Sequence, residues 1–151
     1  MDKKIEAVAK CVGIQDWKNL KACILFESGG NPKAVNPYSK ATGLIQFMPQ
    51  TAAALGTSIE QLSRMSAEKQ LDYVEKYFYP WRGKLKTLED IYMAILWPRA
   101  VGKPSTYVLF EKADAKYPKR YLQNKGLDWN KDGFITKAEA AAKVRKIRAT
   151  L

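Results

Sequence analysis

The stretch Glu27-Ser28-Gly29-Gly30-Asn31-Pro32, with Gly43-Leu44-Ile45-Gln46-Phe47-Met48-Pro49-Gln50-Thr51 after it, is the part of the chain that best indicates its fold. Glu27 ends the apolar run Cys23-Ile24-Leu25-Phe26, and no other acidic residue lies between Asp16 and Glu60. A carboxyl group against apolar surface resists ionisation because desolvation penalises its charged form, and the C-terminal end of a helix acts in the same direction. The sequence therefore predicts a general acid at Glu27, the alternative being a solvated glutamate at a helix end.

The phrases that carry this region follow one another in a fixed order: Glu27-Ser28, Asn31-Pro32-x-Ala34, Ser39, and Gly43-Leu44-x-Gln46-x-Met48-Pro49-x-Thr51. Over about residues 20–56 this ordered set resembles the soluble lytic transglycosylase family of the lysozyme superfamily. The resemblance implies an all-α, lysozyme-like helical domain. It also implies an enzyme that cleaves the β-1,4 bond between N-acetylmuramic acid and N-acetylglucosamine in peptidoglycan, with Glu27 protonating the bridging oxygen.

The resemblance suggests substrate contacts on the same stretch. Ser39 and Gln46 are expected to hydrogen-bond the sugar, and Phe47 and Met48 to form walls of the groove, although these residues could also simply pack the loop.

Tyr92 lies where the family carries Ala-Tyr-Asn and is a candidate hydrogen-bond partner of the acid. This sequence departs from the pattern, since Ile91 replaces the alanine and Met93 the asparagine. A core tyrosine on an apolar helix is the competing interpretation.

Water-using glycosidases generally need a second carboxylate, and the first acidic residue after Glu27 is Glu60. The transglycosylase route avoids this need, because the C6 hydroxyl of the muramoyl residue closes a 1,6-anhydro ring. Two alternatives stay open. One is a hydrolytic, goose-type-like muramidase that uses a distant carboxylate, for which the candidates are Asp72, Glu75, Glu89 and Asp90. The other is a calcium-binding virion component with a degenerate active site.

The segment Asp128-Trp129-Asn130-Lys131-Asp132-Gly133-Phe134-Ile135-Thr136-Lys137-Ala138-Glu139 matches the twelve-residue EF-hand loop. The expected calcium ligands are Asp128, Asn130, Asp132, the Phe134 carbonyl, Thr136 through water, and Glu139. Only one such loop is present, which favours a structural ion over a signalling switch. The alternative is a vestigial loop in which Asx turns and a Thr136–Glu139 capping box start a helix without metal. No cofactor is expected for catalysis.

Helical periodicity dominates the chain, and no run of strand alternation is evident. One domain over residues 1–151 is expected, with a catalytic core at about 14–105, the calcium loop at 128–139 and a terminal helix at 137–151. The expected helices are residues 2–12, a helix capped by Asp16 that includes Glu27, one ending at Leu55, a short one capped by Thr57, one from Ser66 to Pro80, one from Thr87 to Pro98, and parts of 105–124. Residues 28–42 are expected to form a loop.

Composition narrows the function classes. The formal net charge of +11 favours a polyanionic partner, and no recognition motif supports nucleic acid. The absence of histidine excludes Ser-His-Asp and Cys-His catalysis and His-ligated zinc. Cys11 and Cys23 are expected to be two reduced, buried thiols.

The N-terminus lacks a signal-peptide core, so the protein is expected to be made soluble in a bacterial host cytoplasm. It would reach peptidoglycan through a holin or in a virion, as a monomeric bacteriophage lysin; a bacterial exported effector is the alternative. The terminal helix is expected either to dock on the body or to contact anionic envelope lipid.

Overall fold

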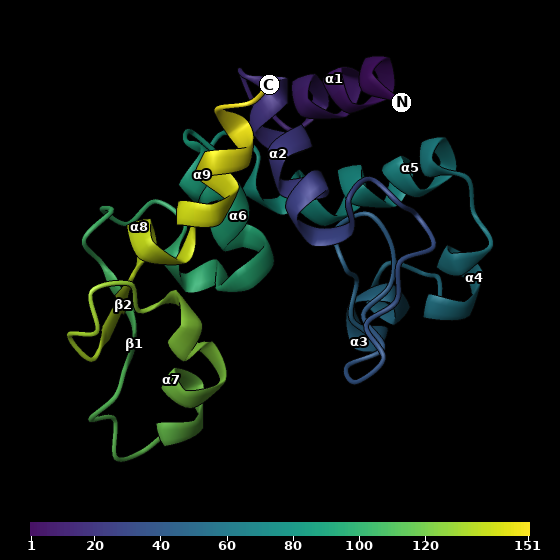
Figure 1. Ribbon diagram of the computed structural model, residues 1–151. Coiled ribbons are helices and arrows are strands. Elements are labelled where there is room, and N and C mark those ends of the chain that lie inside the picture. Colours follow the sequence, from purple (N-terminus) through teal and green to yellow (C-terminus); the bar gives the residue numbers. More distant parts are fainter.

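Helix α2 (Trp17–Ser28) packs mainly against three other helices, and the computed structural model describes residues 1–151 (Figure 1). The Asp16 side chain accepts a hydrogen bond from the Lys18 backbone N–H at its start, as the sequence predicts. Gly29 ends it at φ 65°, a left-handed conformation that glycine adopts without steric cost. Helices α1 (Asp2–Cys11), α6 (Leu88–Leu96) and α9 (Ala142–Arg148) all lie against α2.

The chain is rich in helix, as expected. The remaining elements, in chain order, are α3 (Pro49–Ala54), α4 (Ile59–Ser63), α5 (Ala67–Phe78), the 3-10 turns η1 (Tyr79–Trp81) and η2 (Pro98–Ala100), β1 (Val108–Glu111), α7 (Pro118–Asn124), the 3-10 turn η3 (Lys125–Leu127), β2 (Phe134–Thr136) and α8 (Lys137–Ala140). One apolar core joins them, and it includes Ile5, Val8 and Ala9 of α1 as the helical spacing predicts. None of the helices is both long enough and apolar enough to cross a membrane.

The expectation of a purely α-helical chain is wrong in one region. Strands β1 and β2 pair antiparallel, with Phe110 opposite Ile135 and both side chains buried. β1 lies within residues 105–124, where helix was predicted in parts and no strand was predicted. The strands have four and three residues, too few to show an alternation that could be distinguished from a helical pattern.

Two helix boundaries also differ from the predictions. Ser58, not Thr57, caps α4, because its side chain accepts from the Gln61 backbone N–H while Thr57 bonds the Gln61 side chain. The predicted terminal helix breaks at Ala141, which ends α8 and precedes α9. α9 is docked on α2, and Val144 is fully buried there.

Ser66 and Thr87 cap α5 and α6 as predicted. Cys11 and Cys23 are free thiols, but only Cys23 is buried, so the prediction of two buried cysteines is wrong for Cys11.

Candidate active site

Glu27 lies in the last turn of α2, and its side chain is partly buried. Burial raises the pKa of the Glu27 carboxyl to about 7, and no neighbouring charge contributes to that shift. The carboxyl makes no hydrogen bond or ion pair, although its oxygens are not enclosed. A carboxyl group in this state carries a proton near neutral pH and can transfer it to a ligand.

The loop that follows Glu27 is fixed from both ends. Ser28 Oγ donates to the Leu44 carbonyl at 2.9 Å, which ties the end of α2 to the far side of the loop. Thr42 and Phe47 exchange backbone hydrogen bonds of 3.0 and 2.9 Å and close a tight turn between them. The segment that carries the predicted sugar contacts is therefore a held structure beside the acid, not a free loop.

Gln70 of α5 stabilises this loop through buried hydrogen bonds, a role that the sequence did not indicate. Its fully buried side chain accepts from the Leu44 N–H and donates to the carbonyls of Pro32 and Leu62. The Gln70 amide occupies the space that a Cβ on Gly43 would need, and Gly43 has φ 90°. Glycine is thus required at position 43 for both conformation and space.

A small pocket of about 50 Å³ opens beside this loop. Its lining residues are Ile45, Gln46, Phe47, Met48, Thr51, Tyr77 and Ile95. Three of the predicted substrate-binding residues are therefore brought together, and α5 and α6 supply Tyr77 and Ile95 opposite them. Phe47 is buried with its ring edge-on to Tyr77, while Met48 is exposed, so Met48 is the more available groove wall.

Gln46 and Ser39 are both occupied within the loop. Gln46 has φ 59°, and its amide nitrogen donates to the carbonyls of Ala34 and Gly43, so only its Oε1 is free for a ligand. Ser39 is exposed, its Oγ accepts from the Ala41 N–H, and it does not line the pocket. Their predicted contacts with sugar stay predictions.

Tyr92 lies near the acid but is not bonded to it. Its ring meets Phe26 edge-on at 5.6 Å between centroids, and its side chain is buried. Burial and then the charge of Glu27 raise the pKa of the Tyr92 phenol.

Tyr77 is in a similar position, since burial and the charge of Glu27 raise its pKa too. Its hydroxyl donates to the Ala94 carbonyl at 2.5 Å. Sequence reasoning placed Tyr77 only in the core, because helical spacing alone cannot separate a groove tyrosine from a core one.

The carboxylates of the hydrolytic alternative are mostly engaged elsewhere. Asp72 pairs with Lys4 at 2.7 Å, Glu89 pairs with Arg145 at 2.5 Å, and Asp90 pairs with Lys137. Glu75 alone has no such partner, and its charge does not contribute to the pKa of Glu27. Glu27 thus stands without a second carboxylate acting on it.

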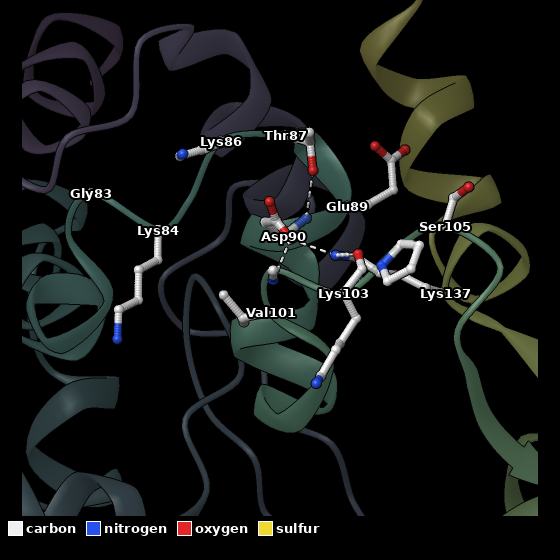
Figure 2. Close-up of a pocket in the computed structure, with 12 residues that line it drawn as sticks. Gly83, Lys84, Lys86, Thr87, Glu89, Asp90, Val101, Lys103, Ser105 and Lys137 are labelled. Atoms are coloured by element: carbon white, nitrogen blue, oxygen red, sulfur yellow. Dashed lines mark hydrogen bonds and ion pairs between the residues drawn. The ribbon is translucent and has the colours of Figure 1, made fainter.

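A hollow of about 560 Å³ lies at the N-terminal end of α6 (Figure 2). Glu89 and Asp90 line it, but Glu27 and the residues of the small pocket do not. Val101 is its one hydrophobic lining residue. Burial alone would raise the pKa of Asp90 there, but Lys137 and the Gly102 N–H hold it below its usual value. The two carboxylates that line the hollow, Glu89 and Asp90, are each paired with a cation. The hollow therefore offers no proton donor comparable to Glu27.

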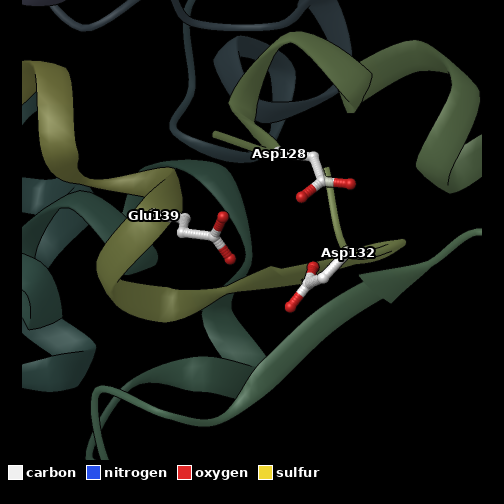
Figure 3. Close-up of side chains that lie close together, drawn as sticks. All are labelled: Asp128, Asp132 and Glu139. Carbon is white, nitrogen blue, oxygen red and sulfur yellow. The ribbon is translucent and has the colours of Figure 1, made fainter. Parts of the chain in front are cut away.

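Three carboxylates of the predicted calcium loop converge (Figure 3). Oxygen atoms of Asp128, Asp132 and Glu139 lie within 4.8 Å of one another. Asp128 is buried, and its Oδ1 has no hydrogen-bond partner. An enclosed carboxylate oxygen without a donor costs free energy unless a cation satisfies it, so these residues suit a hard, oxygen-binding cation.

The other predicted ligands bond one another or belong to regular secondary structure. Asn130 and Asp132 bond each other, and Thr136 and Glu139 form the capping box of the alternative interpretation. The Phe134 carbonyl belongs to β2. This strand pairs with β1 of the same domain, and not with a second loop of the same kind.

Sequence reasoning missed Tyr121. Its hydroxyl donates to Asp128 Oδ2 at 2.5 Å, and this bond raises the pKa of Tyr121 to about 12 and lowers that of Asp128.

The chain matches the transglycosylase SLT domain model over residues 7–82, about half of its length. It therefore belongs to this family of lytic transglycosylases, whose substrate is peptidoglycan. The match covers α2, the held loop and α5, and so includes Glu27 and the pocket residues up to Tyr77. Tyr92 and the loop at 128–139 lie outside it.

Proposed function

We propose that this chain cleaves the bond between N-acetylmuramic acid and N-acetylglucosamine with Glu27 as its single catalytic carboxyl, leaving 1,6-anhydro ends. The observation that carries the proposal is the state of Glu27: partly buried, unpaired, and with a pKa raised to about 7 by burial alone. A hydrolase would need a second carboxylate to activate water, and the paired states of Asp72, Glu89 and Asp90 argue against it.

The reaction uses one proton twice. Glu27 gives its proton to the bridging oxygen as the bond from C1 of the muramoyl residue breaks, and positive charge develops at C1. The neighbouring N-acetyl oxygen supports that charge. Glu27, now ionised, takes the proton of the C6 hydroxyl while the C6 oxygen bonds C1. The proton ends where it began, and no water is consumed.

The mass of the products tests this proposal. Digestion of purified peptidoglycan should yield muropeptides with 1,6-anhydro ends, each lighter by one water than the hydrolysis product, and few reducing muramic ends. Mainly reducing ends would establish the hydrolytic alternative, in which case Glu75, the one unpaired candidate, is the first residue to neutralise. No soluble product from wild-type protein would point to a degenerate site.

We also propose that the loop at 128–139 binds calcium as a structural ion. The proposal rests on the orphaned, buried Asp128 Oδ1 and on the convergence of Asp132 and Glu139 toward it. Asp128 and Glu139 would hold the ion from opposite ends of the loop, which would keep β2 and α8 in their relative positions. Isothermal titration with calcium tests this, and an Asp128→Ala protein that binds calcium as the wild type does would refute it.

A role in bacteriophage lysis or in virion-associated wall degradation is the biological context we propose. The positive charge of the chain, +11, suits an anionic bacterial wall. Production in the bacterial cytoplasm with and without a co-expressed holin tests it: lysis that depends on the holin supports a lysis enzyme, and recovery of the protein in purified particles supports a virion component. If neither of these two results were obtained, that would argue against a phage role of any kind.

A further inference from the structure

Two arginines lie over aromatic rings at the C-terminal end of α6. The Arg120 guanidinium carbon lies 3.8 Å from the centre of the Tyr117 ring and 5.0 Å from that of Trp97, and Arg99 lies 5.9 Å from Trp97. We call these four residues the arginine cluster. It belongs to a part of the chain beyond residue 82, outside the family match.

The cluster has a rigid base. Trp97 follows the last residue of α6, and its backbone N–H donates to the Met93 carbonyl. Its ring packs edge-on against the ring of buried Phe110 of β1, with 5.1 Å between the ring centroids. Arg120 is partly buried on α7, and Arg99 is exposed in η2. The two cations are therefore brought to one tryptophan from separate elements.

Neither guanidinium has an anionic partner. Arg145 and Arg148 pair with Glu89 and Asp16, but Arg99 and Arg120 form no ion pair and their side chains donate no hydrogen bond. They do not cap the last carbonyls of α6, the role that would explain cations at a helix C-terminus. A guanidinium stacked on a ring keeps its in-plane N–H groups free, and their fork matches a carboxylate or phosphate.

The cluster lies at the end of α6 that also carries one residue of the candidate groove. Ile95, two residues before Trp97, lines the pocket with Gln46, Phe47 and Met48. Tyr92, whose pKa is raised by burial and then by the Glu27 charge, is on the same helix. Five residues of helix span about 7.5 Å, so Trp97 lies roughly one helical turn and a half along α6 from Tyr92.

We propose that Arg99 and Arg120 bind the carboxylates of the peptide stems of peptidoglycan while the glycan lies over Glu27. This proposal rests on the function proposed above and adds what part of the substrate is recognised. Peptidoglycan carries its stems on the muramic residues, one of which must be at the acid during cleavage. The stem of that residue or of its neighbour then reaches the end of α6, where two unpaired guanidinium groups can donate hydrogen bonds to its carboxylates.

Binding to insoluble peptidoglycan by the non-cleaving Glu27→Gln protein tests the proposal without requiring turnover. The wall is stripped of phosphate polymers and used in two forms, one native and one with its stem carboxylates converted to carboxamides. The Arg99→Gln/Arg120→Gln protein is compared with Lys3→Gln/Lys10→Gln, which removes the same charge from two exposed, unpaired lysines of α1. Melting curves show whether each variant is folded.

We expect the arginine variant to bind native wall at least tenfold more weakly, because hydrogen bonds between charged groups are the strong ones. The lysine variant should stay within about twofold, and amidation should weaken binding of the Glu27→Gln protein to the level of the arginine variant. If the double variant does not fold, exposed Arg99→Gln alone should still lose about threefold.

Other outcomes overturn the proposal. Equal losses in the lysine and arginine variants would show a general charge effect, and unchanged binding to amidated wall would show that stem carboxylates are not the ligand. Tight binding that returns only when phosphate polymers are retained would assign the arginines to phosphate. If Glu27→Gln left wall cleavage intact, the proposed function would fail while the binding result still stood.

Discussion

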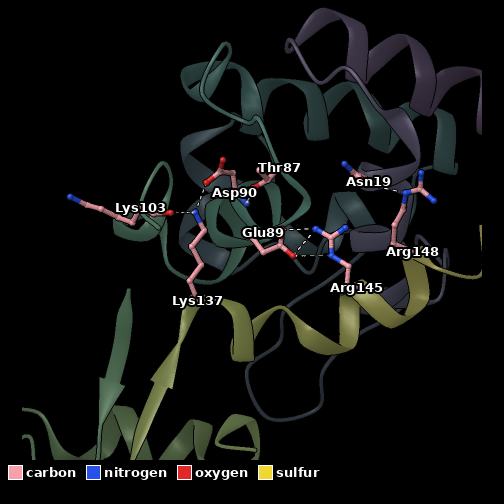
Figure 4. Close-up of polar contacts among 8 residues, drawn as sticks. All are labelled: Asn19, Thr87, Glu89, Asp90, Lys103, Lys137, Arg145 and Arg148. Atoms are coloured by element: carbon pink, nitrogen blue, oxygen red, sulfur yellow. Dashed lines mark hydrogen bonds and ion pairs between the residues drawn. The ribbon is translucent and has the colours of Figure 1, made fainter. Parts of the chain in front are cut away.

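Lys137, the first residue of α8, donates from its buried Nζ to the buried Asp90 carboxylate near the start of α6 (Figure 4). The same ammonium reaches the Lys103 carbonyl at 2.8 Å, and Asp90 also accepts from the Gly102 N–H. These bonds join the last part of the loop at 128–139 to the helix that carries Tyr92. Arg145 with Glu89, and Arg148 with Asp16 and Asn19, extend the connection to α2.

Breaking this pair should strongly destabilise the protein. Lys137→Met leaves the Asp90 carboxylate buried without its cation, which typically costs about 3–5 kcal/mol. Replacing both residues, Lys137→Met with Asp90→Leu, should recover much of that loss. Urea unfolding measures all three proteins, and Arg148→Gln, which breaks a more exposed pair, should cost no more than about 1 kcal/mol. A Lys137→Met loss as small as that of Arg148→Gln would contradict the expectation.

Glu27→Gln should keep the fold and lose wall lysis, because glutamine preserves shape and polarity but has no transferable proton. Removal of a general acid typically lowers the rate by roughly 10²–10⁴-fold. Clearing of a wall suspension provides the measurement. Glu75→Gln is the matched control, since Glu75 is also partly buried and unpaired, and it should act at the wild-type rate. Retention of more than a tenth of the rate by Glu27→Gln would remove Glu27 from the mechanism.

The pH dependence of kcat/KM should show a single descending limb. The free enzyme must hold the proton of Glu27, whose pKa burial raises to about 7, so activity should fall tenfold per pH unit well above 7. No ascending limb should appear between pH 5 and 7, because no second carboxylate has to ionise. Rates on soluble glycan fragments, measured at constant ionic strength, decide the matter; a bell-shaped profile would favour the hydrolytic alternative.

Glu27 should also make folding stability fall with rising pH. Its pKa is about 7 in the folded protein against an ordinary value of 4.5, so between these values the folded chain keeps a proton that the unfolded chain releases. Above pH 7 the buried charge costs up to roughly 3 kcal/mol. Glu27→Gln should therefore be more stable than the wild type at pH 8, and the difference should vanish near pH 4.5. Unfolding curves at the two pH values test this, and equal stabilities at pH 8 would show that the carboxyl is better solvated than its position indicates.

Calcium should raise the melting temperature more than it raises the catalytic rate. A ligand that binds only the folded state stabilises it by about 2.7 kcal/mol at a hundredfold excess over Kd. Calorimetry with calcium and with chelator gives the increment, and Asp128→Ala with Glu139→Ala should abolish it. Because Glu139 also closes the capping box, only the calcium-dependent increment is compared. Melting curves that coincide in the two conditions would leave the loop as a helix start without metal.

The parts of the structure that the sequence predicts are those set by local rules. Asp16, Ser66 and Thr87 cap the predicted helices, and an apolar run that ends in Glu27 is enough to expect a partly buried acid. The parts that it does not predict depend on contacts distant in the chain. Three- and four-residue strands give no periodic signal, and β1 becomes visible only through its pairing with β2.

The same limit applies to the site. Tyr77 and Ile95 join the groove because α5 and α6 bring them opposite Met48, and nothing local distinguishes them from their core neighbours. Tyr121 meets Asp128 for a similar reason: α7 precedes the loop and folds back onto it. The spacing of the three carboxylates in this loop can be read from the sequence, whereas the residue that bonds the first of them cannot.

The dependence of Gly43 on Gln70 restricts how this enzyme can change. A larger residue at 43 requires a smaller one at 70, yet a smaller residue at 70 leaves the Leu44 N–H and the Pro32 carbonyl without their buried partner. Single substitutions at either position therefore pass through a less stable protein. Altered glycan preference is better sought at exposed Met48. Directed evolution can reshape the groove wall there without passing through a destabilised protein.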